Sequence, residues 1–246
     1  MGNLIIIGDS FCHDVRRKES WVVQLMQDYE ILSYGIPATG WWTHLANFNK
    51  IKNYFDSRET TVIWIHSSNE RLPNKLHAPI TSSVTRYELN DPAKYELDRF
   101  FQSRTDETHQ RVFNAAKTFY LSELYDNEFY EYIELLWWTD LSSRILKDYK
   151  KVIFLSGIQN KQFNNNIDRL LTPNSIVVKT ELKKISAAEN PNHVFNGKGD
   201  PRPNHLNEHN NVEMYKLLKD LIENGETNQA VDIDLSTWEI TDSSKL

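Results

Sequence analysis

Short apolar runs alternate with amphipathic stretches along most of this chain. The runs are rich in β-branched and aliphatic residues and are bounded by polar or turn residues, as is typical of strands buried on both faces of a sheet. They lie at about 4–7, 30–34, 61–66, 151–156 and 175–179. Between them, apolar residues recur three and four positions apart, which predicts helices over about 20–29, 41–55 and 208–224. This alternation predicts a parallel sheet with right-handed crossovers.

Two stretches depart from the alternation. Residues from about 93 to 147 lack strand signals and carry large apolar residues at helical spacing, such as Tyr130, Ile133 and Trp137. We therefore expect a helical insertion between strands three and four. Beyond a domain at 1–225, the polar tail 226–246 contains an alternating run at 230–235, which predicts an edge strand or a segment that pairs with another chain.

Composition narrows the class of protein. A chain of 246 residues that is 39% hydrophobic can bury one core, and its formal net charge of −6 without a long basic cluster disfavours nucleic-acid binding. The single Cys12 excludes an intramolecular disulfide, and the N-terminus lacks a signal-peptide pattern, so we expect a cytoplasmic protein. The apolar runs are far shorter than the roughly 20 residues that span a bilayer.

The first strand ends in a turn that can carry chemistry. Gly8, Asp9 and Ser10 directly follow the first apolar run, which puts a serine at the carboxyl end of a buried strand, where open α/β sheets have their sites. Near the other end of the chain, His205 comes just before the last predicted helix. A serine hydroxyl and an imidazole are the nucleophile and base of acyl transfer. Taken singly, the serine could be only a helix cap and the histidine only a surface residue.

These residues resemble the SGNH (GDSL-type) hydrolases, a family with Gly-Asp-Ser after the first strand and a catalytic histidine before the final helix. The resemblance extends from Gly8 to about Asn211 and implies a serine esterase that needs no cofactor. The fold we expect is a flavodoxin-like three-layer sandwich with a five-stranded parallel sheet in the order 2-1-3-4-5. Gly-x-Ser-x-Gly is absent, which argues against an ordinary α/β-hydrolase. The family occurs widely in bacteria and their phages.

The resemblance assigns an oxyanion hole to the backbone N–H of Ser10, a backbone N–H after strand two and an asparagine after strand three. Strict spacing puts Ala38 at the second position, but we favour Gly40, because glycine permits the closest approach. Asn69 matches the asparagine by type, although its loop reads Ser-Ser-Asn-Glu-Arg and the residue could be a turn former.

The acidic residue departs from the family pattern. The aspartate usually found three residues before the histidine is replaced by Arg202, and the nearest carboxylate is Asp200. Pro201 and Pro203 stiffen this segment and could bring Asp200 toward the imidazole of His205. A Ser-His dyad without an acid, and an inactive descendant of the fold, are the alternatives.

The remaining candidates concern ligands and partners. His205 and His209 have the spacing of a zinc pair, but no third ligand accompanies them, so we expect neither a metal nor a cofactor. The expected partner is a small-molecule or glycan ester, with a homo-oligomer through the tail as a further expectation. Two other functions stay open: a non-catalytic SGNH-fold protein with a structural or receptor-binding role, and a flavodoxin-like module that binds a phosphate ligand. The second lacks a Gly-rich phosphate loop.

Overall fold

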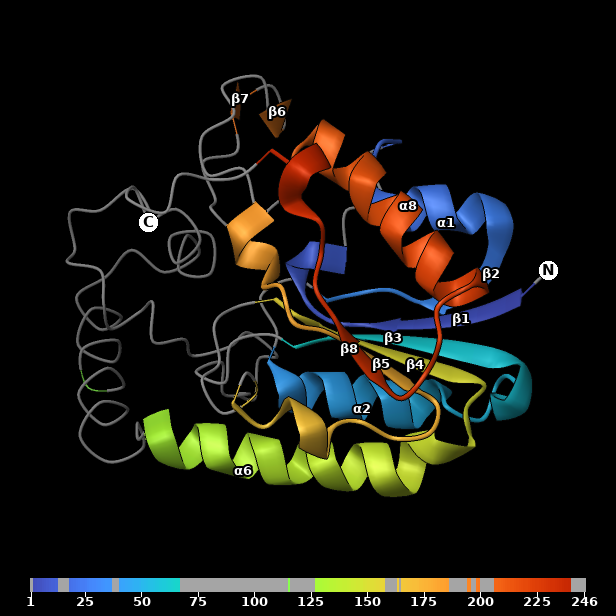
Figure 1. The fold of residues 1–246 in the computed structure, drawn as a ribbon, viewed down its shortest axis with the longest axis vertical. Coiled ribbons are helices and arrows are strands. Elements are labelled where there is room, and N and C mark those ends of the chain that lie inside the picture. Colours follow the sequence, from blue (N-terminus) through green and yellow to red (C-terminus); the bar gives the residue numbers. More distant parts are fainter. Residues whose placement is uncertain are drawn as a thin grey trace.

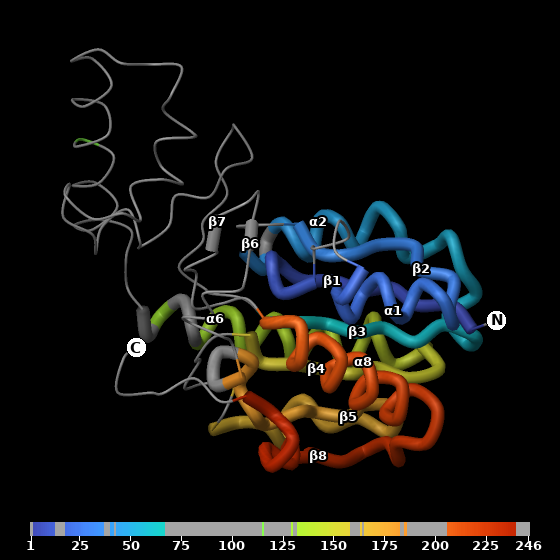
Figure 2. The backbone as a smooth tube through the Cα atoms, turned by 90° about the horizontal axis from the view of Figure 1, so that it is seen from above, coloured from blue at the N-terminus to red at the C-terminus, as the bar shows by residue number. Residues whose placement is uncertain are grey.

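The computed structural model describes residues 2–12, 18–36, 40–66, 127–157, 165–185 and 206–239, the single residues Ala115 and Phe163, and two short strands, β6 (Val194–Phe195) and β7 (Lys198–Gly199). The described part contains one six-stranded sheet in the order β2-β1-β3-β4-β5-β8, and every neighbouring pair is parallel (Figures 1 and 2). Its strands are β1 (Gly2–Ile7), β2 (Tyr29–Ser33), β3 (Thr60–His66), β4 (Lys151–Ser156), β5 (Ser175–Val178) and β8 (Gln229–Val231). The predicted α/β sandwich and the predicted order of its first five strands are confirmed.

Helices cover both faces of this sheet, as Figure 1 shows, with α1 and α8 on one face and α2 and α6 on the other. Their bounds are α1 (Trp21–Asp28), α2 (Trp41–Ile51), α6 (Asn127–Asp140) and α8 (Glu208–Glu223). Shorter helical turns are η1 (Ser10–Cys12), η2 (Ser57–Glu59), η4 (Leu141–Ile145), η5 (Leu146–Asp148), η6 (Ile167–Arg169), η7 (Leu182–Ile185) and η8 (Leu235–Thr237).

The core has two halves, one on each face of the sheet. Because successive side chains of a strand point to opposite faces, Leu4 and Ile6 pack with α1 and α8, whereas Ile5 and Ile7 pack with residues of α2 and α6. All four are at most 1% exposed. Burial on both sides explains why residues 4–7 of β1 form a continuous apolar run.

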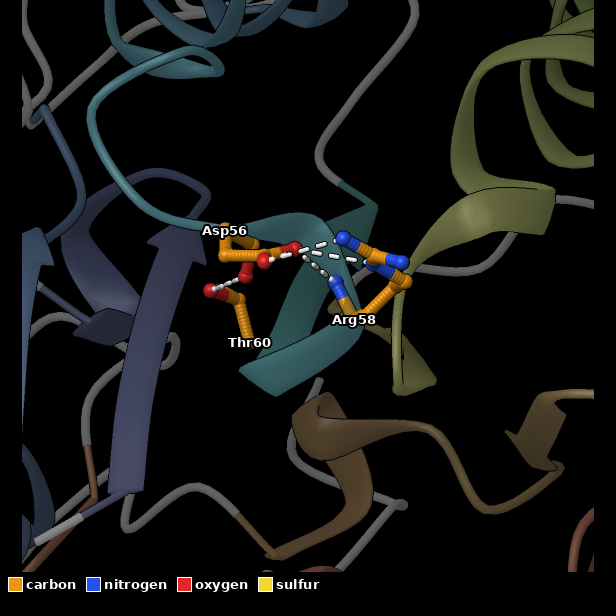
Figure 3. A network of polar contacts seen from close by, with 3 residues as sticks. All are labelled: Asp56, Arg58 and Thr60. Atoms are coloured by element: carbon orange, nitrogen blue, oxygen red, sulfur yellow. Dashed lines mark hydrogen bonds and ion pairs between the residues drawn. The ribbon is translucent and has the colours of Figure 1, made fainter.

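The amino end of β3 is set by a capped turn (Figure 3). The Asp56 carboxylate accepts a hydrogen bond from the Arg58 backbone N–H at 2.9 Å, and the Thr60 hydroxyl donates to the Asp56 carbonyl at 2.7 Å. The hydrogen bonds from Arg58 hold the pKa of Asp56 below its ordinary value. This turn lies at the amino end of β3, whereas the candidate site lies at the carboxyl end.

The expected insertion and tail are described in part. The helix α6 covers the residues at helical spacing, while most of 93–126 lies outside the described residues. In the tail, β8 pairs with β5 of the same chain, and Ile233 and Trp238 are buried in the core cluster that contains α8. No helix among the described residues is long and apolar enough to cross a membrane.

Candidate functional site

Ser10 opens a single helical turn, η1, and is separated from the end of β1 by Gly8 and Asp9. The Asp9 side chain is fully buried and accepts a hydrogen bond from the Phe11 N–H at 3.1 Å, and the Cys12 N–H donates to the Asp9 carbonyl at 3.2 Å. Ser10 itself is partly buried. The predicted turn therefore exists. Its backbone is held by hydrogen bonds from the two residues after Ser10 to Asp9, the residue before it.

The loop after β2 clamps this turn from the side. The Gly35 N–H donates to the Cys12 carbonyl and the Ile36 N–H donates to the Gly8 carbonyl, each at 3.0 Å. A Cβ atom on Gly35 would lie 2.1 Å from the Asp9 carbonyl oxygen, so this close approach requires glycine. Cys12 lies inside the clamp, and burial raises the pKa of its thiol well above the ordinary value, which keeps it from acting as a thiolate nucleophile.

Ser10 lies at the point where the chain changes direction in the sheet. From β1 the chain passes to β2 on one side and then returns to β3 on the other side of β1. The carboxyl ends of β1 and β3 thus flank the topological switch point, where open α/β sheets bind their ligands. Ser10 follows β1 at this point, and His66 is the last residue of β3.

Of the other predicted site residues, Gly40 is described. It is buried, it precedes α2 as its N-cap, and its carbonyl accepts hydrogen bonds from the N–H groups of Thr43 and His44. Its φ of −106° is one that any residue adopts, so the backbone conformation there does not require glycine. Asn69, Asp200 and His205, with the alternative Ala38, lie outside the described residues, and their roles stay predictions.

Leu206 directly follows His205 and is the described residue that leads into α8. Leu206 is 5% exposed and belongs to the same core cluster as Phe11 and Cys12 of the Ser10 turn. Asn207 then caps α8, with its side chain accepting a hydrogen bond from the Asn210 N–H at 2.7 Å. The start of α8 is thus packed into the half of the core that also holds the Ser10 turn.

A buried pair that sequence reasoning missed lies at the carboxyl end of β3. The Nδ1 atom of His66 is 2.7 Å from Oε1 of Glu134 on α6, and each side chain is 2% exposed. Phe163 stacks on the imidazole with 5.8 Å between ring centroids, and Trp138 meets it edge-on at 5.6 Å. These four residues and Leu135 line a cavity of about 10 Å³, close to the room that one water molecule needs.

The sequence did contain a signal for this pair. His66 ends a strand whose other residues are apolar or threonine, and Glu134 lies among the large apolar residues at helical spacing. An ionisable side chain in a buried element needs a polar partner, because leaving it unpaired is costly. The sequence gives no means of choosing Glu134 over other acidic residues.

The part of the chain that the structure describes contains no group of three or more His, Cys, Asp or Glu side chains able to hold a metal ion. His209, considered as half of a zinc pair, instead donates from its Nε2 to the Thr237 carbonyl at 2.6 Å. Its ring therefore fastens the C-terminal segment to the first turn of α8.

Comparisons with known proteins do not identify a family. No family model, no curated protein and no solved structure matches this chain.

Proposed function

We propose that this chain is a serine hydrolase that cleaves a carboxylic ester, with Ser10 as nucleophile and His205 as general base. The observation that carries the proposal is the position of Ser10 directly after β1, at the switch point between β1 and β3. The hydrogen bonds that the buried Asp9 accepts, and those that Gly35 and Ile36 donate to the Ser10 turn, support the proposal. A nucleophile works best on a backbone that is fixed before the substrate binds.

In the proposed reaction, the Ser10 Oγ attacks the ester carbonyl carbon while His205 accepts the hydroxyl proton. The C–O bond to the alcohol then breaks, His205 returns the proton to the departing alcohol oxygen, and Ser10 is left acylated. Water then attacks the acyl carbonyl carbon while His205 accepts its proton, the bond between that carbon and the Ser10 Oγ breaks, and His205 returns the proton to the Oγ as the acid leaves. Asp200 orients the imidazole.

The oxyanion of the tetrahedral intermediate is assigned to the N–H groups of Ser10 and Gly40 and to the side-chain amide of Asn69. Gly40 lies at the N-terminus of α2, which supports the assignment of its N–H to the oxyanion hole. The positive end of a helix dipole favours a developing negative charge. The substrate class is an acetylated sugar, a lipid or another small ester.

A fluorophosphonate probe tests the proposal, because it modifies an activated serine covalently. We expect mass spectrometry to find the adduct on Ser10, and we expect Ser10→Ala to abolish both labelling and hydrolysis of p-nitrophenyl acetate. Ser20→Ala is the matched control, since Ser20 is buried next to α1 and its side chain makes no cap hydrogen bond. It should keep both activities.

Two results would contradict the proposal. Hydrolysis that survives in Ser10→Ala, with an adduct on another residue, would remove Ser10 as nucleophile. A folded wild-type protein that neither reacts with the probe nor hydrolyses the ester would favour the non-catalytic SGNH-fold protein with a structural or receptor-binding role.

A further inference from the structure

Two buried residues, Trp21 and Asn211, join the Ser10 turn to the start of α8. The indole Nε1–H of Trp21 donates to the Phe11 carbonyl at 2.9 Å, and its backbone N–H donates to the Asn211 Oδ1 at 3.1 Å. The Asn211 Nδ2 then donates to the Leu206 carbonyl at 3.1 Å and to the Asn207 carbonyl at 2.8 Å. We call this series of hydrogen bonds the Trp21–Asn211 bridge.

The ends of the bridge are next to the two candidate catalytic residues in the sequence. Phe11 follows Ser10, and Leu206 follows His205. Trp21 is 1% exposed and Asn211 is 9% exposed, so water competes little for these hydrogen bonds. The Trp21 N–H is also one of the first N–H groups of α1, which have no partner within their own helix. Breaking the bridge would leave buried donors and acceptors unsatisfied, which makes the connection stiff.

We propose that Asn211 is a positioning residue that, through Trp21, sets the distance between Ser10 and His205. This inference rests on the proposed function. A nucleophile and its base must stay within hydrogen-bond reach of each other, and a displacement of about 1 Å can lower the rate on the order of 100-fold. A connection that begins one residue after the nucleophile and ends one residue after the base limits that displacement.

The neighbouring Asn210 makes a matched comparison. It is also buried, donates to the Ile185 carbonyl at 2.6 Å and the Glu239 carbonyl at 2.7 Å, and accepts from the Glu239 N–H at 2.9 Å. Each of the two asparagine side chains therefore makes three hydrogen bonds. Those of Asn210 fasten Ile185 and the C-terminal segment, whereas those of Asn211 lead to the Ser10 turn.

The experiment compares Asn211→Ala with Asn210→Ala. We expect both variants to lower the melting temperature, since each loses three buried hydrogen bonds. The kcat for p-nitrophenyl acetate should fall about 10- to 100-fold in Asn211→Ala with little change in KM, because the loss concerns the geometry of the reacting groups. In Asn210→Ala we expect kcat to stay within about threefold of the wild type, since its hydrogen bonds do not reach the Ser10 turn.

Trp21→Phe is the second variant, and it decides the matter if Asn211→Ala does not fold. It keeps an aromatic ring in the core and the backbone hydrogen bond to Asn211, but it loses the indole donor to Phe11. A lowered kcat in folded Trp21→Phe protein supports the bridge. An unchanged kcat in that variant, or equal losses of kcat in the two asparagine variants, overturns the positioning role while leaving the proposed function intact. A wild type without Ser10-dependent hydrolysis overturns both.

Discussion

The imidazole of His66 and the carboxylate of Glu134 lie 2.7 Å apart in the core, joining the end of β3 to α6. Because both side chains are only 2% exposed, bulk solvent has little access to either of them. The pair therefore fixes how α6 sits against the sheet at the same edge as the Ser10 turn.

Removing one member of this pair should destabilise the protein strongly. We expect Glu134→Ala to lower the free energy of unfolding by about 2–4 kcal/mol, because the imidazole of His66 would lose a buried polar neighbour and the missing side-chain atoms would leave a cavity. Glu134→Gln should lose less, since the amide keeps a polar oxygen and nearly the same side-chain volume next to the imidazole. Urea denaturation measures both. The control is Asp140→Ala, also on α6, whose exposed pair with Arg144 at 2.8 Å should contribute about 1 kcal/mol or less. Equal losses in Glu134→Ala and Asp140→Ala would contradict the prediction.

Lys151 is expected to stabilise the end of α8. It is 8% exposed, and its Nζ donates to the carbonyls of Leu221, Ile222 and Gly225 at 2.7, 2.9 and 2.9 Å. These groups lie at a helix C-terminus, where a positive charge is favourable and carbonyls lack partners within the helix.

Lys151→Met keeps the aliphatic stem of the side chain and removes all three donors. We expect the free energy of unfolding, measured in urea, to fall by about 2–4 kcal/mol. The exposed neighbour Lys150 provides the control, and Lys150→Met should change stability by no more than about 0.5 kcal/mol. If Lys151→Met were as stable as Lys150→Met, Lys151 would not act as a cap.

We expect the protein to lose stability at alkaline pH because of the buried phenol of Tyr149. Its hydroxyl donates to the Lys52 carbonyl at 3.1 Å, and burial raises the pKa of its phenol to about 12 from an ordinary value of 10.0. Because the folded-state pKa is the higher one, the contribution to stability is complete below pH 10 and is lost as the pH rises from 10 toward 12. Within that window, Tyr149 lowers the free energy of unfolding by at most about 1.4 kcal/mol per pH unit.

Tyr149→Phe should cost about 1 kcal/mol at pH 7 and should make the alkaline decline shallower than in the wild type. The free energy of unfolding at pH 8, 10 and 11 measures this difference. A weaker decline persists through Tyr29, whose phenol pKa is also raised, by burial and by its hydrogen bond to Glu223. Parallel curves for wild type and variant would show that folding does not raise the pKa of Tyr149.

The proposed general base predicts a pH dependence of the rate. If His205 accepts the Ser10 proton, kcat/KM should fall below a pKa near 6.5, the ordinary value of an imidazole. His205→Asn should remove this acidic limb. His209→Asn is the control, because the His209 ring already donates to Thr237, and this variant should keep the limb. A flat wild-type profile from about pH 5 to 8 would exclude His205 as the base.

Asp200 decides between a triad and a dyad. If it orients His205, Asp200→Asn should lower kcat strongly with little change in KM, because the carboxylate matters most when the imidazolium forms. In a dyad the same substitution should lower kcat less than about tenfold, or roughly 1.4 kcal/mol. Steady-state kinetics with p-nitrophenyl acetate separate the two cases.

The sequence by itself determined the strands of the main sheet, the main helices and their order along the chain. The strand expected at 151–156 is found at Lys151–Ser156, and the helix expected at about 208–224 is found at Glu208–Glu223. Such elements are readable because burial on both faces demands a continuous apolar run and burial on one face demands a helical period, and both patterns are local. The turn that holds Ser10 was readable for the same reason, whereas the predicted roles of Asn69, Asp200 and His205 concern residues outside the described ones.

Only the tertiary structure decided which distant polar groups meet. Trp21 and Asn211 are 190 positions apart, and Lys151 meets carbonyls about 70 positions further on. The sixth strand joins β5 of its own chain, although its alternating pattern was equally compatible with pairing to another chain. A residue's own neighbourhood shows that a buried polar group needs a partner but carries no information on which one, because that choice is made when sheet order and helix packing bring remote segments together.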